Sequence, residues 1–210
     1  VKELTALHAV ATAEAESLSE DEIITKVTLA ISQIYSEVCG ILLLDATGRL
    51  LTPHLSYHGA DISNWQNGYP ITEGITGKAV ATGKIIRTGD VTKESGYIEI
   101  ATKVISELCV PIRVNERVIG VVNVESKSAD AFTEHDEGFL TTIASGLGTA
   151  LEKLRLFNEE QRRAKELNTL YLATKSLTQS LEPTTIAEKL IAIINGLLDY
   201  DSASIHVVDD

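Results

Sequence analysis

The side chains that could act as nucleophiles or metal ligands are few in this sequence. The two cysteines, Cys39 and Cys109, each lie within an apolar run and show no metal-ligand or redox spacing. Two isolated thiols are typical of a reducing compartment and not of a disulfide framework. We therefore predict that both thiols are buried structural groups.

The histidines and glycines point to no metal or phosphate chemistry either. His54 and His58 are four residues apart, which would align two ligands on a helix, but their segment has the pattern of a strand and a loop. Gly74, Gly77 and Gly83 are not followed by the Gly-Lys-Ser/Thr of a phosphate-binding loop. The sequence therefore predicts no metal site and leaves any cofactor unspecified.

The composition sets the class of protein and of partner. Of 210 residues, 44% are apolar and 23% are charged, which is typical of a globular protein. A formal net charge of −12 argues against a nucleic-acid partner. Apolar runs stay short of the roughly 20 residues that span a bilayer, and no signal-peptide pattern opens the chain. We predict a cytoplasmic location and no membrane partner. Because the chain begins at Val1 and contains no Met, we expect an excised fragment.

The elements that would position a site are organised around the segment Ser106–Ser126, which consists of two apolar runs joined by a short polar turn. Asn115 tolerates a positive φ angle, so a two-residue hairpin turn that pairs Val114 with Arg117 fits there. Both faces of this hairpin are mostly apolar. This pattern predicts a central hairpin that is covered on both sides.

The same pairing assigns side chains to the two faces of the hairpin. It places Leu108 opposite Asn123 on one face and Cys109 on the other face. Gly120 has no side chain to pack, which indicates that another backbone approaches closely there. Asn123 is the one polar residue on its face, so we expect its amide to have buried hydrogen-bond partners.

Helices and short strands surround this hairpin in the sequence. Ser19 and Glu22 have the spacing of a capping box and open the second of two N-terminal helices. Apolar periodicity predicts helices over residues 2–17, 19–35 and 74–83, and strands over residues 38–45, 50–56 and 85–87.

A long helix is predicted from Thr133 to Leu181, where no Pro interrupts the pattern. Leucines recur at three-to-four spacing beyond the part that would cover the sheet, and two such helices side by side would bury them as a coiled-coil seam. We predict a homodimer through Thr133–Leu181 and the N-terminal helix. The matching stripes are Leu167, Leu170, Leu177 and Leu181 in the long helix and Leu4, Leu7, Ala11 and Leu18 in the N-terminal helix.

Several of these motifs occur in an order that resembles the GAF domain. They are the hairpin ending in VIGVVNVES, the helix start at Ala131–Asp136, and the upstream segments Glu73–Gly83 and Gly89–Val91. The resemblance runs through Leu18–Phe157. It implies an α/β (α+β) fold with a central, mostly antiparallel sheet, helices on one face, a loop-covered pocket on the other, and a long linker helix after it.

In GAF domains the ligand lies between the sheet and the loops and short helices above it. Aromatic walls with a few convergent polar groups suit a small ligand. The positions that the resemblance assigns to this candidate pocket are Tyr57, Trp65, Tyr69, Thr76, Arg87, Asp90, Tyr97, Ser106 and Asn123.

One GAF-like family is catalytic, because the free methionine sulfoxide reductases use cysteines around the pocket. The matching positions in this chain are Gln66, Thr76 and Ile100. Without a thiolate at these positions, sulfoxide reduction has no nucleophile. We therefore predict that the protein is not an enzyme and has no catalytic residue.

The chain also repeats part of itself, since Lys2-Glu3-Leu4 recurs as Lys165-Glu166-Leu167 and Ile23 corresponds to Ile186. This repeat indicates tandem GAF-like domains. The predicted parts are an N-terminal linker helix (1–18), a GAF-like domain (19–157), a connecting signalling helix (158–182) and the truncated start of a second GAF-like domain (183–210).

These observations favour a sensory or regulatory module of a prokaryotic signalling protein, such as a histidine kinase. It would bind a small molecule, relay a signal through a dimeric helix, or do both. Two alternatives remain open. One is a ligand-free structural dimerisation domain, and the other is a small-molecule enzyme of the methionine sulfoxide reductase type.

Overall fold

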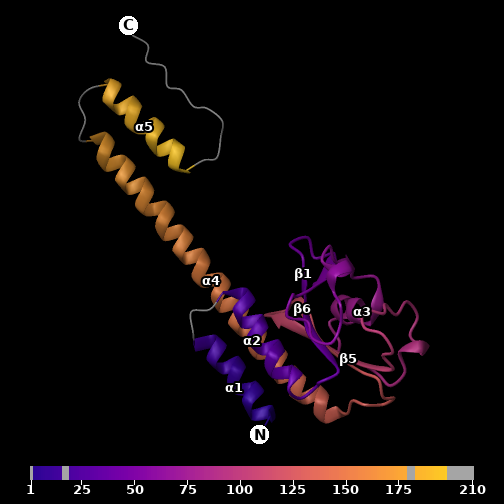
Figure 1. The fold of residues 1–210 in the computed structure, drawn as a ribbon. Helices are drawn as coiled ribbons and strands as arrows, with labels where there is room; N and C mark the ends of the chain where they lie inside the picture. The colour runs from indigo at the N-terminus through magenta and orange to yellow at the C-terminus, as the bar shows by residue number, and fades with distance from the viewer. Residues whose placement is uncertain (1, 16–18, 179–182, 198–210) are drawn as a thin grey trace. The chain divides into compact units, whose positions relative to one another are not determined.

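The computed structural model describes residues 2–15, 19–178 and 183–197. Six antiparallel strands form one sheet in the order β3-β2-β1-β6-β5-β4. The predicted α+β fold, with helices on one face of an antiparallel sheet, is confirmed (Figure 1). The strands are β1 (Val38–Leu44), β2 (Leu50–Pro53), β3 (Tyr69–Pro70), β4 (Ile86–Thr88), β5 (Ser106–Val114) and β6 (Arg117–Ser126).

The central hairpin is β5 and β6, joined by the predicted tight turn. Asn115 has a φ of 53°, and Val114 pairs with Arg117. Gly120 meets a close backbone neighbour, as expected, because a Cβ atom there would overlap the carbonyl oxygen of Leu42. The turn and the close approach were therefore both predictable from residue type.

The register of this hairpin differs from the prediction by one residue. Ile112 pairs with Gly120 while Arg113 pairs with Val118, so Ile119 is an extra residue in a β-bulge. Beyond the bulge Cys109 pairs with Asn123, and the predicted pairing of Leu108 with Asn123 is wrong. A slip of one residue moves every side chain to the opposite face of a strand.

Helix α2 (Glu20–Ser32) and the first part of α4 (Glu134–Thr178) cover one face of the sheet, and α1 (Lys2–Ala15) packs on the outside of α2 (Figure 1). The capping box forms at the start of α2, since Ser19 Oγ accepts from the Glu22 amide and the Glu22 carboxylate accepts from the Ser19 amide. The core on this face is apolar. Its largest buried members include Ile24, Ile31, Leu108, Ile112, Leu140, Ile143 and Leu147.

Helix α1 packs on its own chain through Ala6 and Val10. Ala6 and Val10 are buried in the core, whereas 72% of Leu4 is exposed. Leu7 is partly buried against the same core, and the small side chains of α1 allow it to approach α2 closely. Leu18 lies outside the described residues.

The other face of the sheet is covered by α3 (Gly74–Thr82) and by the connections around it. These connections include two short 3₁₀ turns, Ser63–Trp65 and Val91–Lys93. A second hydrophobic cluster lies beneath them and includes Leu42, Leu51, Ile75, Ala79 and Val121. Polar side chains enter this cluster from the central hairpin.

The long helix is confirmed as α4, whose 45 residues run from Glu134 to Thr178. The chain divides into two compact units, residues 1–155 and 156–210, and the second contains the end of α4 and α5 (Pro183–Leu197). Leu167 and Leu170 are 68% and 54% exposed. Leu181 and the predicted strand at 203–208 lie outside the described residues. Nowhere in the described ranges is a helix long and apolar enough to cross a membrane.

Candidate functional site

Two glutamate side chains lie side by side on the loop-covered face of the sheet. Glu107 on β5 and Glu125 on β6 are directly paired across the central hairpin. They are only 3% and 4% exposed. Neither carboxylate forms an ion pair with any described residue. Two buried acids without a cation are unusual, because desolvation and mutual repulsion both oppose their charged forms.

A hydrogen-bond network connects these acids to their neighbours. Asn123 Nδ2 donates to Glu125 Oε1 at 2.8 Å and to Tyr57 Oη at 2.9 Å. Tyr57 Oη in turn donates to Glu125 Oε1 at 3.1 Å. Cys109 Sγ donates to Glu107 Oε1 at 3.1 Å and to Asn123 Oδ1 at 3.2 Å. We call these five residues, Tyr57, Glu107, Cys109, Asn123 and Glu125, the acidic cluster.

The electrostatics of the acidic cluster favour protonated side chains. Burial, together with the charge of Glu125, raises the pKa of Glu107 to about 8. Burial raises the pKa of Glu125 to about 7, although hydrogen bonds from Tyr57 and Asn123 partly oppose this shift. Burial and the charge of Glu107 raise the pKa of the Cys109 thiol well above its ordinary value.

Polar groups without partners lie in the same region. The Oε2 atom of Glu125 and the hydroxyl of Tyr97 are buried and have no hydrogen-bond partner among the described residues. Tyr97 lies in the segment between β4 and β5. Burial is the main cause that raises the pKa of its hydroxyl, and the charges of Glu125 and Glu107 raise it further. The hydroxyls of Tyr69 and Thr76 bond each other at 2.7 Å. The cluster therefore contains hydrogen-bonding capacity that the described side chains do not use.

Six of the nine predicted pocket positions lie on this face of the sheet. Tyr57 and Asn123 belong to the acidic cluster, and Tyr69 bonds Thr76 above it. Trp65 contacts Tyr69 edge to face, with ring centroids 5.6 Å apart. Tyr97 contributes the unpartnered hydroxyl described above.

The other three predicted positions lie elsewhere. Arg87 bonds Glu137 and the Phe132 carbonyl oxygen at the helix-covered face. Asp90 caps the 3₁₀ turn that follows it by accepting from the Thr92 amide at 3.1 Å. Ser106 donates to the Ser128 carbonyl oxygen at 2.7 Å. Arg87 pairs with Leu108 in the sheet and shares its face, so the alternation of β4 directs this guanidinium away from the cluster.

Glu107, Cys109 and Glu125 were not among the predicted positions. The signal for the two acids was present, since each is a charged residue within an apolar strand pattern. The signal for Cys109 was lost through the one-residue register error, which placed this thiol on the face opposite Asn123. The other thiol, Cys39, does lie in the helix-covered core, and burial raises its pKa to about 12.

The histidines that the sequence raised as possible ligands have separate partners. The two ring nitrogens of His54 contact Ser56 Oγ and Asp21 Oδ1, and His58 Nε2 contacts the Ser36 carbonyl oxygen. Within the described ranges, no group of three or more His, Cys, Asp or Glu side chains could hold a metal ion.

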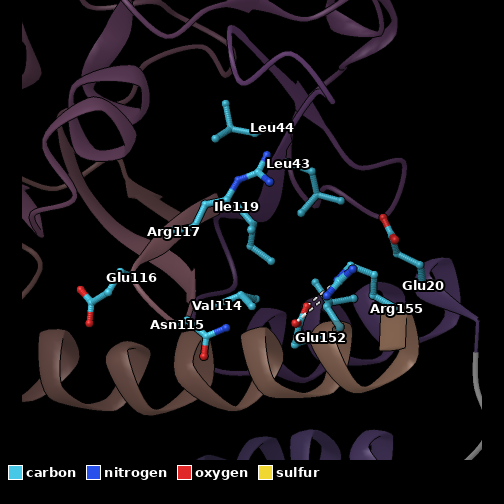
Figure 2. Close-up of a pocket in the computed structure, with 11 residues that line it drawn as sticks. Glu20, Leu43, Leu44, Val114, Asn115, Glu116, Arg117, Ile119, Glu152 and Arg155 are labelled. Atoms are coloured by element: carbon cyan, nitrogen blue, oxygen red, sulfur yellow. Dashed lines mark hydrogen bonds and ion pairs between the residues drawn. The ribbon is translucent and has the colours of Figure 1, made fainter. Parts of the chain in front are cut away.

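A concavity of about 620 Å³ lies at the hairpin turn, away from the acidic cluster (Figure 2). Aliphatic and charged side chains both line it, and Glu152 accepts hydrogen bonds of 2.7 and 2.9 Å from Arg155 at its rim (Figure 2). None of the nine predicted pocket positions lines this groove. Its lining residues are Glu20, Leu43, Leu44, Val114, Asn115, Glu116, Arg117, Ile119, Leu151, Glu152 and Arg155.

The GAF domain family model matches residues 17–152 of the chain. Protein YtsP of Bacillus subtilis is 38% identical over 82 residues, which cover 39% of this chain and 50% of that protein. The free methionine-R-sulfoxide reductase of Escherichia coli is 32% identical over 82 residues, with the same two coverages. The chain thus spans about half the length of the curated relatives it matches.

A solved structure with the same fold is the free methionine-R-sulfoxide reductase of Neisseria meningitidis in complex with its substrate. Its TM-score is 0.64 at 22% identity, and the match covers 72% of this chain and 89% of that one. The relatives and structural neighbours therefore include enzymes. The prediction that this protein is not an enzyme, which was based on three missing cysteines, is wrong.

Proposed function

This chain belongs to the GAF domain family, and we propose that it is a regulatory module that binds a small molecule carrying a positively charged group. The ligand would lie at the acidic cluster, beneath the segments that cover the sheet. The observation that supports this proposal is the buried, cross-strand pair Glu107 and Glu125 without a cation among the described residues.

The chemistry of the pair selects the ligand class. A carboxylate buried without a partner costs several kcal/mol, so proteins keep such groups where a cation or a proton compensates them. An ammonium group carries three donors, and the unpartnered Glu125 Oε2 is one acceptor available to it. The Tyr97 hydroxyl could bond a second polar group of the same molecule. A free amino acid, or another small amine with a second polar group, meets both demands.

Access to the cluster requires the covering segments to move. Tyr57 and Tyr69 are 7% and 4% exposed, and the ring of Tyr57 lies against Gly40, where a Cβ atom would overlap it. The covering residues belong to connecting segments, which are the parts of a fold that most readily rearrange. Entry of a ligand would therefore open this cover and alter the contacts above the sheet.

The comparisons support the same ligand class. Free methionine-R-sulfoxide, which the reductases among the relatives are named for, is an amino acid and carries an ammonium group. We therefore choose this compound as the first probe, together with the free amino acids. N-acetylmethionine-R-sulfoxide is the matched control, because acetylation removes the positive charge and leaves the side chain intact.

Isothermal titration calorimetry of the whole chain with these probes tests the proposal. We expect at least one amine probe to bind, with affinity reduced at least tenfold by N-acetylation or by Glu125→Gln. Glu116→Gln, an exposed carboxylate at the hairpin turn, should leave the affinity unchanged. If no amine binds, or if the acetylated compound binds equally well, the proposed cation site is wrong and a ligand-free scaffold becomes the better explanation.

Reduction of a free sulfoxide is the second candidate function. It is supported by the reductases among the relatives and by Cys109, whose thiol lies within the acidic cluster. Attack of this sulfur on a sulfoxide would release the sulfide and leave a sulfenic acid on Cys109, which an external thiol would reduce. Because the pKa of Cys109 is raised, turnover should increase with pH.

An assay of free methionine-R-sulfoxide consumption with a dithiol reductant tests this second candidate. Activity that Cys109→Ser abolishes and Cys39→Ser preserves would establish Cys109 as the nucleophile. Turnover that survives Cys109→Ser would exclude this mechanism, and so would a wild type without turnover at any pH.

We also propose that the module acts as a homodimer in the cytoplasm, within a tandem array of a prokaryotic signalling protein. Leu167, Leu170 and Tyr171 are 54–68% exposed on α4, and a second copy would bury such a stripe. Light scattering should give the mass of two chains for the wild type and of one chain for Leu167→Asp with Leu170→Asp. A monomeric wild type would refute the dimer.

A further inference from the structure

We infer that the Glu107–Glu125 pair holds a proton when the site is vacant and exchanges it for the ammonium group of a bound ligand. This inference rests on the proposed function and adds its regulation. The site would then respond to pH and ligand together, because each proton that leaves the pair makes room for one positive charge.

The geometry of the pair by itself favours a bound proton. The two carboxylates are directly opposite each other on neighbouring strands, where like charges destabilise a sheet. Both are almost completely buried, so water cannot screen their repulsion. Two carboxylates that share a dry site cannot both be ionised, and one of them retains a proton above its ordinary range. The raised pKa values of both side chains agree with this picture.

Among the residues that the structure describes, the surroundings of the pair supply no alternative positive charge. The hairpin contributes Cys109 and Asn123, and the covering segments contribute Tyr57, Tyr69 and Tyr97. The additional charges that act on the pair and on Tyr97 are those of Glu94 and Glu99, which are also acidic. Glu94 has its own partner, Lys78, at 3.3 Å. A proton is therefore the compensating charge that the vacant site can take from solution.

Binding of an ammonium group reverses this balance. The ligand's positive charge stabilises both carboxylates in their ionised forms, so their pKa values fall and the shared proton is released to solvent. The exchange moves one proton out as one ammonium enters, and no bond to carbon forms or breaks. The net charge of the buried site is the same before and after the exchange, so binding adds no further uncompensated charge to it.

The first test uses the 210-residue chain without added ligand. Infrared spectroscopy at pH 7 should show the band of a protonated carboxyl group in the wild type. The band should be absent from the double variant Glu107→Gln with Glu125→Gln, which keeps the side-chain shapes. If the wild type shows no protonated carboxyl at pH 6, the pair is fully ionised and the inference is overturned.

The second test measures proton release on binding. Calorimetric titrations with free methionine-R-sulfoxide and the free amino acids are repeated at pH 7 in two buffers of different ionisation enthalpy. We expect release of roughly one proton per ligand, and an affinity that rises up to about tenfold per pH unit between pH 6 and 7. Glu116→Gln should show the same release as the wild type, whereas Glu125→Gln should show less.

The outcomes separate this inference from the proposed function. Binding with no dependence of the heat on the buffer overturns the proton exchange and leaves the ligand site in place. If no probe binds at any pH, the proposed function fails and the exchange fails with it, whatever the infrared band shows.

Discussion

The two faces of the central hairpin differ in the chemistry that they bury. Toward the helices, β5 directs Leu108, Val110 and Ile112 into an apolar core. Toward the loops, the same strand directs Glu107 and Cys109 into a hydrogen-bonded cluster. Successive side chains of one strand therefore serve two different purposes, because alternation sends them to opposite faces.

The covers of the two faces account for this difference. Helices satisfy their own backbone groups and offer side chains for close packing, so the face beneath α2 and α4 can be dry and apolar. Connecting segments present hydroxyls and backbone groups, such as those of Tyr57 and Tyr97, and they rearrange more easily. The comparison indicates that the helix-covered face holds the fold together and that the loop-covered face carries the chemistry.

The largest effect is expected on the helix-covered face. Leu140 is fully buried between α4 and the sheet, so Leu140→Ala should lower the free energy of unfolding by about 2–5 kcal/mol, through lost burial and a residual cavity. Chemical denaturation measures the change. Leu55→Ala is the control, since Leu55 is 78% exposed and its truncation should cost at most about 0.5 kcal/mol. A loss below about 1 kcal/mol at Leu140 would contradict a closely packed face.

The next effect belongs to the loop-covered face and depends on pH. The pKa of Glu107 is about 8 in the folded chain and lies near 4.5 when the chain is unfolded. Between these two pKa values the folded state binds more protons than the unfolded state. The free energy of unfolding is therefore greatest in acid and falls as the pH rises toward 8. Glu107→Gln removes the ionisable group and should flatten this decline.

The measurement is the free energy of unfolding at several pH values between 5 and 9. At pH 8 the variant should be roughly 1–3 kcal/mol more stable than the wild type, and the difference should shrink toward pH 5. Glu116→Gln should reproduce the wild-type profile. A variant that is less stable than the wild type at pH 8 would mean that the ionised Glu107 is compensated within the fold.

A smaller effect is expected from the hydroxyl that joins the cluster to its cover. Tyr57→Phe keeps the ring over Gly40 but removes a donor to Glu125 and an acceptor from Asn123. Partial loss of these buried hydrogen bonds should cost about 1–2 kcal/mol in thermal or chemical unfolding at pH 6. Tyr171→Phe is the matched control, because Tyr171 is 63% exposed. Equal effects in the two variants would show that the hydrogen bonds of Tyr57 do not stabilise the fold.

Much of the fold could be predicted from the sequence because its signals are local. Periodicity located the main helices, the Ser19–Glu22 spacing marked a helix start, and Asn115 marked the turn. The β-bulge at Ile119 could not be predicted, since a bulge changes the register without changing the pattern of residue types. That one residue decided which thiol joined the site.

The site was only partly predictable for a related reason. Aromatic residues such as Tyr57 and Tyr69 were found through family resemblance, but Arg87 was misplaced because the face of a three-residue strand is set by its pairing with β5. Glu107 and Glu125 stood out as charges within apolar strands. Their meaning depends on being opposite each other, which is a property of register and not of either residue alone.

The smallest effect should come from a carboxylate that already has its partner, and it sharpens the contrast with Glu107. Glu152 lies at the rim of the groove and accepts two hydrogen bonds from Arg155 (Figure 2). These bonds hold the pKa of Glu152 below its ordinary range. A carboxyl group whose pKa is lowered on folding stabilises the folded state at pH values above its pKa in the unfolded chain. This contribution is lost as the pH falls through its pKa in the folded chain.

Glu152→Gln should therefore behave with the opposite sign to Glu107→Gln. The variant should be slightly less stable than the wild type at pH 7, by less than any change above, and the difference should disappear in acid. Between pH 5 and 9 its stability should run parallel to that of the wild type, because Glu152 stays ionised throughout that range. Thermal unfolding across this range, with both variants measured together, gives the comparison. Glu107→Gln is expected to flatten the decline in the free energy of unfolding above pH 6. If Glu152→Gln flattened it equally, the cause would be the general loss of negative charge in an acidic protein and not the buried pair.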